Sequence, residues 1–195
     1  MRLEREFFAR SGPIVARELL GMTLVRRLPT GEQLRGRVVE TEAYHGVDDS
    51  GSHARAGKTG RTAIMFGEAG HAYVYLIYGM YHMLNVSTAE VDIPSAVLVR
   101  AVEPLEGIEM MLRLRDVKLN NLTNGPGKVC QAMAIDRSLN DEDLIHSQAL
   151  WFERGESIPD LLVGTSPRIG IDYADAEHRE RPWRFFEKGN RWISK

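Results

Sequence analysis

Apolar and polar residues alternate along the chain in a way that predicts both strands and short helices. A helix is expected over residues 13–20, because Pro13 suits a first helical turn and Gly21 follows the last apolar position. Two hairpins are expected where alternating segments flank short turns. Their segments are residues 22–28 with 33–44, around Pro29-Thr30-Gly31, and residues 72–78 with 81–87, around Gly79-Met80.

The remaining segments place further strands and helices beside these hairpins. Residues 95–102 are expected to form an apolar strand, after which Pro104 opens a helix that runs to residue 115. Residues 45–70 show no sustained period, so a long loop is expected, and long loops inside compact domains are commonly functional. The other expected elements are a helix over residues 128–134 and strands over residues 149–154, 168–171 and 183–188.

Taken together, these elements predict an α+β fold with a mostly antiparallel, curved β-sheet flanked by helices. The length of 195 residues, with 43% hydrophobic and 27% charged residues, fits a single soluble domain over residues 1–195. No apolar run approaches the roughly 18 residues that span a bilayer, and the charged start lacks the apolar centre of a secretory signal. The lone Cys130 lies in an apolar segment, so a packed thiol and a reducing cytoplasm are expected.

The charge distribution permits contact with nucleic acid, although the net charge does not favour it. A net charge of -2 argues mildly against duplex binding, because duplex binders are usually basic. The acidic charge, however, is concentrated in residues 136–181, which carry 11 acids and 5 bases. The long loop has a stretch with Arg55, Lys58 and Arg61 and no acid, so these three residues are candidates for phosphate contact.

Two carboxylates and an aromatic ring fall on one face of the predicted strand VVETEAY. Side chains alternate across a strand, so the even-numbered residues are expected to share one side. These residues are Val38, Glu40, Glu42 and Tyr44. A carboxylate beside an aromatic ring suits a pocket that stacks a flat ligand and activates water. An exposed face with solvated glutamates has the same pattern, so the strand by itself leaves both interpretations open.

Arg100 interrupts the otherwise apolar strand SAVLVRAV. A buried guanidinium costs several kcal/mol unless a carboxylate pairs with it, and either Glu42 or Glu40 is a candidate partner. Such a pair keeps a carboxylate ionised and oriented, which a general base at neutral pH requires. A purely structural ion pair is the alternative.

The second hairpin is rich in tyrosine. Tyr73 and Tyr81 are expected to pack in the core, whereas Tyr75 shares a strand face with Tyr73. Tyr78 lies at the turn, where a large aromatic side chain either packs on something or wedges between base pairs.

His53 and Lys128 are the remaining candidates. No second ligand pattern accompanies His53 in the loop, so neither a metal site nor a cofactor is predicted. Lys128 opens a helix after Asn124-Gly125-Pro126-Gly127, a place where backbone N–H groups and a cation can receive a phosphate.

These segments together closely resemble the alkyladenine DNA glycosylase family, also called 3-methyladenine DNA glycosylases. The matching stretches appear in the family's order and span about residues 13 to 193. They are RVVETEAYHG, SHARAGKTGRTAIMF, YVYLIYGMYHMLNVS, VLVRAVEPLEG, NGPGKVCQAMAI and ALWFERG. His45 and His82 stand where apolar residues are expected, which leaves fine substrate preference open.

The resemblance implies a role for each candidate residue. Glu42 corresponds to the glutamate that activates the attacking water, and Arg100 to the arginine that helps hold this water. A flipped purine would lie between Tyr44 and His53 on one side and Tyr75 on the other. The remaining matches are Asn85, which crowds the amino group of guanine, Tyr78, which enters the gap in the duplex, and Lys128, which lies near the DNA.

The implied reaction is base excision from double-stranded DNA by a monomeric enzyme, with alkylated or deaminated purines such as 3-methyladenine and hypoxanthine as substrates. No lysine stands in the pocket motifs, so base removal without strand cleavage is expected. Two other functions are weighed beside it. One is an inverting carbohydrate glycosidase that uses Glu40 and Glu42 as acid and base; the other is a non-catalytic nucleic-acid-binding module.

Overall fold

The computed structural model describes residues 1–194 and has an α+β fold built on one open sheet. Within those residues eight strands are ordered β3-β4-β5-β2-β1-β6, with β8 attached to β2 and β7 attached to β8. Their pairings are antiparallel, so the predicted fold class is confirmed. The strands are β1 (Thr23–Arg27), β2 (Gln33–His45), β3 (Ala72–Ile77), β4 (Tyr81–Ser87), β5 (Ser95–Glu106), β6 (Leu150–Glu153), β7 (Val163–Ser166) and β8 (Arg184–Glu187).

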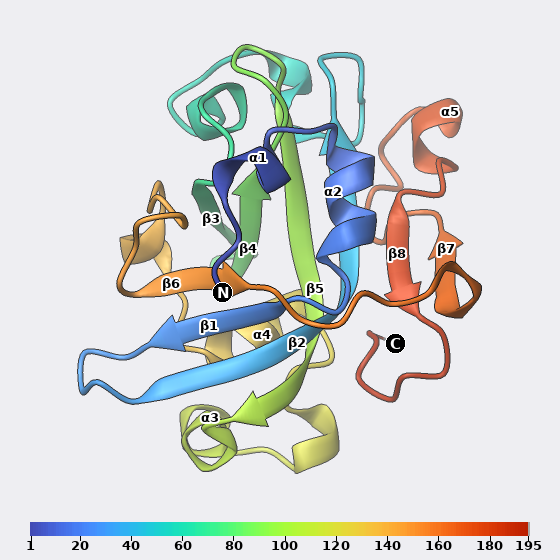
Figure 1. Ribbon diagram of the computed structural model, residues 1–195. Coiled ribbons are helices and arrows are strands. Elements are labelled where there is room, and N and C mark those ends of the chain that lie inside the picture. The colour runs from blue at the N-terminus through green and yellow to red at the C-terminus, as the bar shows by residue number, and fades with distance from the viewer. Residues whose placement is uncertain (195) are drawn as a thin grey trace.

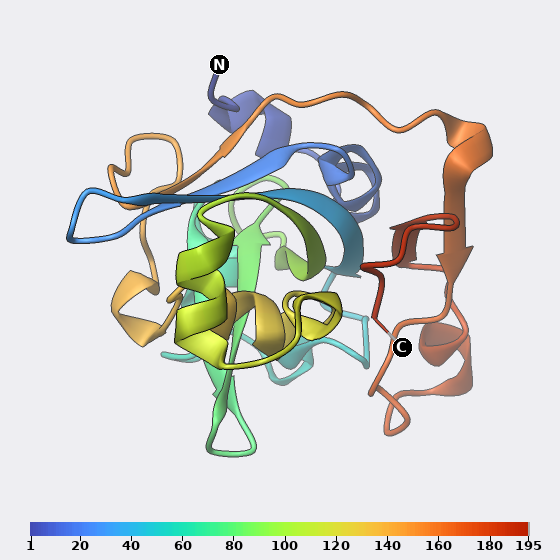
Figure 2. The same ribbon diagram turned by 90° about the horizontal axis from the view of Figure 1, so that it is seen from below.

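Short helices cover both sides of this sheet. In Figure 1, α1 and α2 lie in front of the sheet and α4 lies behind it, and Figure 2 shows the same arrangement from below. None of the helices within residues 1–194 is long and apolar enough to cross a membrane. The α-helices are α1 (Arg5–Phe8), α2 (Gly12–Leu19), α3 (Ile108–Arg115), α4 (Pro126–Ala132) and α5 (Ala176–Arg179). Single 3-10 turns are formed by His53–Ala56, Ala63–Phe66, Leu119–Asn121, Arg137–Leu139 and Asp160–Leu162.

The long strand β2 lies at the centre of the sheet and organises the fold. One edge of β2 pairs with β5, while its other edge pairs with β1 in its first half and with β8 in its second half. The second half of β2 therefore has a neighbour on each edge, and α2 covers one of its faces, where Thr41 Oγ1 donates a hydrogen bond to Ala16 O at 2.7 Å. The opposite face of this half of β2 carries the glutamates.

The pairing of β2 with β5 is irregular near these glutamates. The register shifts between Val38 and Glu40, and again between Glu40 and Thr41, which leaves Val39 and Arg100 without a partner in register. Such β-bulges redirect side chains and are frequent beside active sites. Val38 and Val39, which precede the glutamates, both pack in the main core.

Two predicted elements are wrong. Pro104 does not open a helix; it lies inside β5, opposite Gly36 at a register shift, where a missing N–H is tolerated. The helix starts only after Gly107, whose φ of +74° and close approach to Leu34 favour glycine. In the described part of the chain, residues 168–171 do not form the expected strand. This segment instead turns inward, where Arg168 and Ile169 make hydrogen bonds to β2, and the strand β7 forms just before it.

Candidate active site

A cavity of about 400 Å³ opens between the β3–β4 hairpin, the β2–β5 pair and the long loop. This volume is within the range of sites that take small organic molecules. The lining includes six polar or aromatic side chains from four segments of the chain: Tyr44, His53, Tyr73, Tyr75, Asn85 and Arg100. Five of these six, all except Tyr73, were predicted as site residues from the sequence. The fold brings them together although Tyr44 and Arg100 are 56 positions apart in the chain.

Glu42 lies directly behind this lining and is fully buried. Its Oε1 accepts a hydrogen bond from the backbone N–H of Ile169 at 2.7 Å and lies 3.2 Å from Arg100 Nη1. Its Oε2 accepts a hydrogen bond from the Tyr44 hydroxyl at 2.9 Å. Each of these three partners lines the cavity, so the carboxylate is held at the cavity wall by groups that reach the cavity themselves.

Arg100 bridges both glutamates of the strand. Its Nε donates to Glu40 Oε1 at 3.1 Å while its Nη1 faces Glu42, so both candidate partners are real partners. Burial lowers the pKa of Arg100, but the two carboxylates outweigh burial, and the net shift of the pKa is upward. Arg100 is therefore a fixed positive charge next to Glu42.

Aromatic rings form the walls of the cavity. The Tyr75 ring centroid lies 4.6 Å from that of His53, and the Tyr73 hydroxyl contacts His53 Nδ1 at 3.0 Å. Tyr73 is buried in a small hydrophobic cluster, as expected, and its hydroxyl also contacts the histidine. Burial, followed by the nearby Arg61 and Arg55, lowers the pKa of His53 to about 4, so the imidazole is neutral at physiological pH.

Tyr44 forms another part of the wall and is supported from outside the cavity. The Arg168 guanidinium lies 4.7 Å from the Tyr44 ring centroid and 5.2 Å from that of Trp183. Burial, followed by the charge of Glu42, raises the pKa of Tyr44 well above its usual value. The hydroxyl therefore stays protonated and remains a hydrogen-bond donor to Glu42.

Asn85 and Tyr78 occupy different depths of the cavity. Asn85 is buried on β4, and its Nδ2 donates to the backbone oxygen of Tyr73 at 3.1 Å, which fixes the amide at the wall. Tyr78 lies at the tip of the β3–β4 hairpin, has a φ of +52° and is 83% exposed. Figure 2 shows this hairpin projecting from the body of the molecule. Tyr81, which was expected in the core, is 39% exposed and packs against Gly127 instead.

The basic residues of the long loop, Arg55, Lys58 and Arg61, do not line the cavity. The Arg61 guanidinium lies 5.1 Å from the Tyr75 ring centroid, and Arg55 is exposed. Lys58 Nζ lies 3.8 Å from a carboxylate oxygen of Asp92, with both side chains largely in solvent. A contact of this kind contributes little to stability, so it leaves the lysine available to an external anion.

Lys128 lies on α4, two residues after the lining residue Pro126. Its Nζ donates to Asn121 Oδ1 at 2.6 Å and to Asn124 Oδ1 at 2.9 Å, so the ammonium group is held in one position. The neighbouring Pro126 lines the cavity. Lys128 is thus close to the rim and is not part of the carboxylate cluster.

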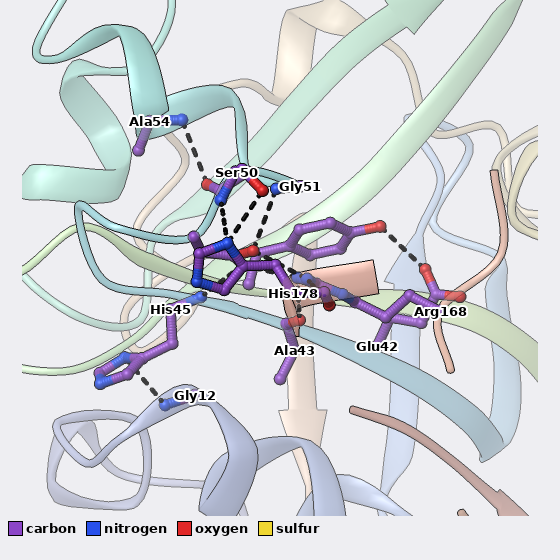
Figure 3. A network of polar contacts seen from close by, with 12 residues as sticks. Gly12, Glu42, Ala43, His45, Ser50, Gly51, Ala54, Arg168 and His178 are labelled. Atoms are coloured by element: carbon purple, nitrogen blue, oxygen red, sulfur yellow. Dashed lines mark hydrogen bonds and ion pairs between the residues drawn. The ribbon is translucent and has the colours of Figure 1, made fainter. Parts of the chain in front are cut away.

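Sequence reasoning missed the ion pair of Asp49 with Arg168. Both side chains are fully buried, with contacts of 2.6 and 2.7 Å, and Arg168 also donates to the backbone oxygens of Ala43 and His178 (Figure 3). Arg168 thus attaches the late segment to Ala43 of β2 and to Asp49 in the loop that follows, next to the hydrogen bond from Ile169 N to Glu42. The only signal in the sequence was an arginine in a segment that was taken for a strand.

The chain is similar to known proteins over nearly its whole length. A family model described as methylpurine-DNA glycosylase matches residues 6–191. A protein of Methanocella arvoryzae named "Putative 3-methyladenine DNA glycosylase" is 49% identical over 99% of this chain and 96% of its own length. The DNA-3-methyladenine glycosylase of Mus musculus is 46% identical over 99% of this chain and 61% of the mouse protein.

The chain is therefore an enzyme, a hydrolase that acts on N-glycosyl bonds. Within this class it belongs to the methylpurine-DNA glycosylase family, since the match covers nearly all of the chain. The two other functions that were weighed, a carbohydrate glycosidase and a non-catalytic binding module, are set aside by this finding. The geometry agrees, because Glu40 is enclosed by Arg100, Arg184 and Ser194, and of these three partners only Arg100 lines the cavity.

Proposed function

We propose that this enzyme turns a damaged purine nucleotide out of double-stranded DNA into the cavity and hydrolyses the bond between base and deoxyribose, which starts base excision repair. One observation carries the proposal: a fully buried carboxylate, Glu42, is held by Arg100 at the wall of an aromatic cavity. A base stacked inside a duplex is out of reach of such a group, so rotation out of the helix is required.

Glu42 is the general base in this mechanism. It accepts a proton from a bound water, whose oxygen forms a bond to the anomeric carbon as the glycosidic bond breaks and the base leaves with the bonding electrons. Arg100 keeps the carboxylate ionised and oriented, and the negative charge of Glu42 stabilises the positive charge that develops on the sugar. The hydrogen bonds from Tyr44 and Ile169 limit the carboxylate to one orientation before the water is activated.

The cavity walls select the base. A flat purine stacks between Tyr44 and His53 on one side and Tyr75 on the other, once His53 and Tyr75 move apart from their edge contact at 4.6 Å between ring centroids. Electron-poor or cationic purines stack most strongly on tyrosine. Asn85 crowds the position of the guanine amino group, which favours 3-methyladenine-type bases and hypoxanthine. The fixed amide of Asn85 supports this role.

The residues around the cavity bind the DNA. The exposed Tyr78 enters the space that the flipped nucleotide leaves, and Arg55, Lys58, Arg61 and Lys128 contact phosphates. Among the described residues no lysine lines the cavity, which supports base removal without strand cleavage. The enzyme acts as a monomer, and the buried lone Cys130 suits a reducing cytoplasm.

The test is single-turnover excision from duplexes that each contain one defined lesion, either hypoxanthine, ethenoadenine or 7-methylguanine. Glu42→Gln is expected to lower the rate constant by at least about 100-fold, the lower end of what a general base contributes, while DNA binding is retained. The product strand is expected to carry an intact abasic site. Glu103→Gln is the matched control, since Glu103 pairs with Arg37 on the same two strands away from the cavity. Excision by Glu42→Gln at the wild-type rate contradicts the proposal.

A further inference from the structure

A second buried carboxylate, Glu40, lies one strand repeat before Glu42 and is fully enclosed. Its Oε1 accepts hydrogen bonds from Arg100 Nε at 3.1 Å, from Arg184 Nε at 2.6 Å and from Ser194 Oγ at 2.6 Å. Its Oε2 accepts the backbone N–H of Ser194. Four donors on one carboxylate leave Glu40 no free face toward the cavity, so it cannot act on a substrate directly.

The four charged groups form one continuous chain across three strands. Arg184 on β8 contacts Glu40 on β2, Glu40 contacts Arg100 on β5, and Arg100 contacts Glu42 on β2. The side chains of the two glutamates are 0% exposed, and those of Arg100 and Arg184 are 9% and 13% exposed. Two positive and two negative charges therefore balance in a poorly solvated space, where an unpaired charge is strongly felt by its neighbours.

Arg100 depends on this chain for its orientation. The bulge in β5 leaves Arg100 outside the regular register, so strand pairing by itself does not determine where its guanidinium points. Its Nε is held by Glu40, with Ser194 Oγ at 3.4 Å, and this contact directs Nη1 toward Glu42. The Arg184 side chain is held in turn by Ser166 Oγ at 3.1 Å.

We propose that Glu40 and Arg184 are positioning residues for the hydrolysis: together they orient Arg100 and set the charge balance around Glu42. This inference rests on the proposed function, in which ionised Glu42 is the base. Neither residue touches the substrate. Both act through Arg100, and their effect on the reaction is therefore electrostatic and geometric.

Because Glu40 and Arg184 carry opposite charges, their removal is expected to shift the pH dependence of the reaction in opposite directions. Removal of Glu40 leaves an extra positive charge, which favours the ionised form of Glu42 and moves the acidic limb of the pH–rate profile to lower pH. Removal of Arg184 leaves an extra negative charge, which moves the limb to higher pH. The other groups that face Glu42 stay unchanged in both variants; they are Tyr44 from β2, Tyr75 from β3, Arg100 from β5 and Arg168, paired with Asp49, from the segment after β7.

The experiment measures single-turnover excision of hypoxanthine from a duplex between pH 4.5 and 9, values chosen to bracket the ordinary carboxyl and histidine range. For Glu40→Gln we expect a plateau rate about 100-fold lower, as a misoriented Arg100 implies, and an acidic limb about one pH unit lower. For Arg184→Met we expect the limb about one pH unit higher. In Glu40→Gln/Arg184→Met the charges balance again, so the limb returns to its wild-type position while the plateau stays low.

Two further variants separate this role from a purely structural one. Arg184→Lys keeps the positive charge and is expected to keep the wild-type limb, and Glu103→Gln breaks an ion pair of the same two strands without any effect on rate or limb. If Glu40→Gln does not fold, Arg184→Met and Arg184→Lys decide the matter, because only the former is expected to shift the limb. The inference is overturned if the acidic limb of the pH–rate profile lies at the same pH in Arg184→Met and Arg184→Lys. It is also overturned if this limb shifts in the same direction in Glu40→Gln and Arg184→Met. An active Glu42→Gln instead overturns the proposed function.

Discussion

The buried pair of Asp49 with Arg168 is expected to be a main determinant of stability. Arg168→Met removes four hydrogen bonds, two to Asp49 and one each to the backbone oxygens of Ala43 and His178, and leaves the carboxylate buried without its charge partner. Removing one partner of a buried pair typically costs about 3–5 kcal/mol. For a chain of this length each kcal/mol lowers the Tm by about 2–4 °C, so a fall of about 6–20 °C is expected.

Urea unfolding of four proteins provides the measurement: the wild type, Asp49→Asn, Arg168→Met and the double variant. The double variant is expected to lose less free energy of unfolding than the sum of the two single variants, because the second substitution removes a charge that is already unpaired. Arg179→Met is the surface control, since Arg179 pairs with Glu180 in solvent and its loss should cost less than about 1 kcal/mol.

The same variants test whether the pair supports the site. Even where the double variant is folded, excision is expected to be slow, because the segment that brings Ile169 N to Glu42 loses the hydrogen bond of Arg168 to Ala43 of β2. If the free energy of unfolding of Arg168→Met lies within about 1 kcal/mol of the wild-type value, the ion pair contributes little to stability. In that case the reasoning from its burial is wrong.

Two further predictions concern single side chains. Burial, followed by Arg61 and Arg55, lowers the pKa of His53 to about 4. The stability contributed by the neutral imidazole is therefore present above the unfolded pKa of about 6.5 and is lost as the pH falls from there toward 4. NMR titration of the imidazole should give a midpoint near 4 that rises in Arg61→Gln, and a midpoint near 6.5 contradicts this prediction. Burial raises the pKa of the Cys130 thiol to about 12, so a thiol reagent at pH 8 should react with it only after unfolding, and fast labelling of the native protein would contradict its place in the core.

The sequence by itself determined the fold class and six of the residues that line the cavity, namely Tyr44, His53, Tyr75, Tyr78, Asn85 and Arg100. Strand periodicity placed Glu40, Glu42 and Tyr44 on one face, and the structure has them there, because alternation over a few residues is a local property of extended backbone. The unusual Arg100 in an apolar strand indicated a buried ion pair, since burial makes an unpaired guanidinium costly. The family resemblance also came from the sequence, and the comparisons agree with it.

Only the tertiary structure decided how these groups are joined. A β-bulge inserts a residue and interrupts the alternation, so the places of Val38 and Arg100 depend on the register with the neighbouring strand. Asp49 and Arg168 are 119 positions apart, and Glu40 and Ser194 are 154 apart. Contacts over such separations leave no periodic trace in the sequence, because they are selected by packing and charge balance once the sheet has formed.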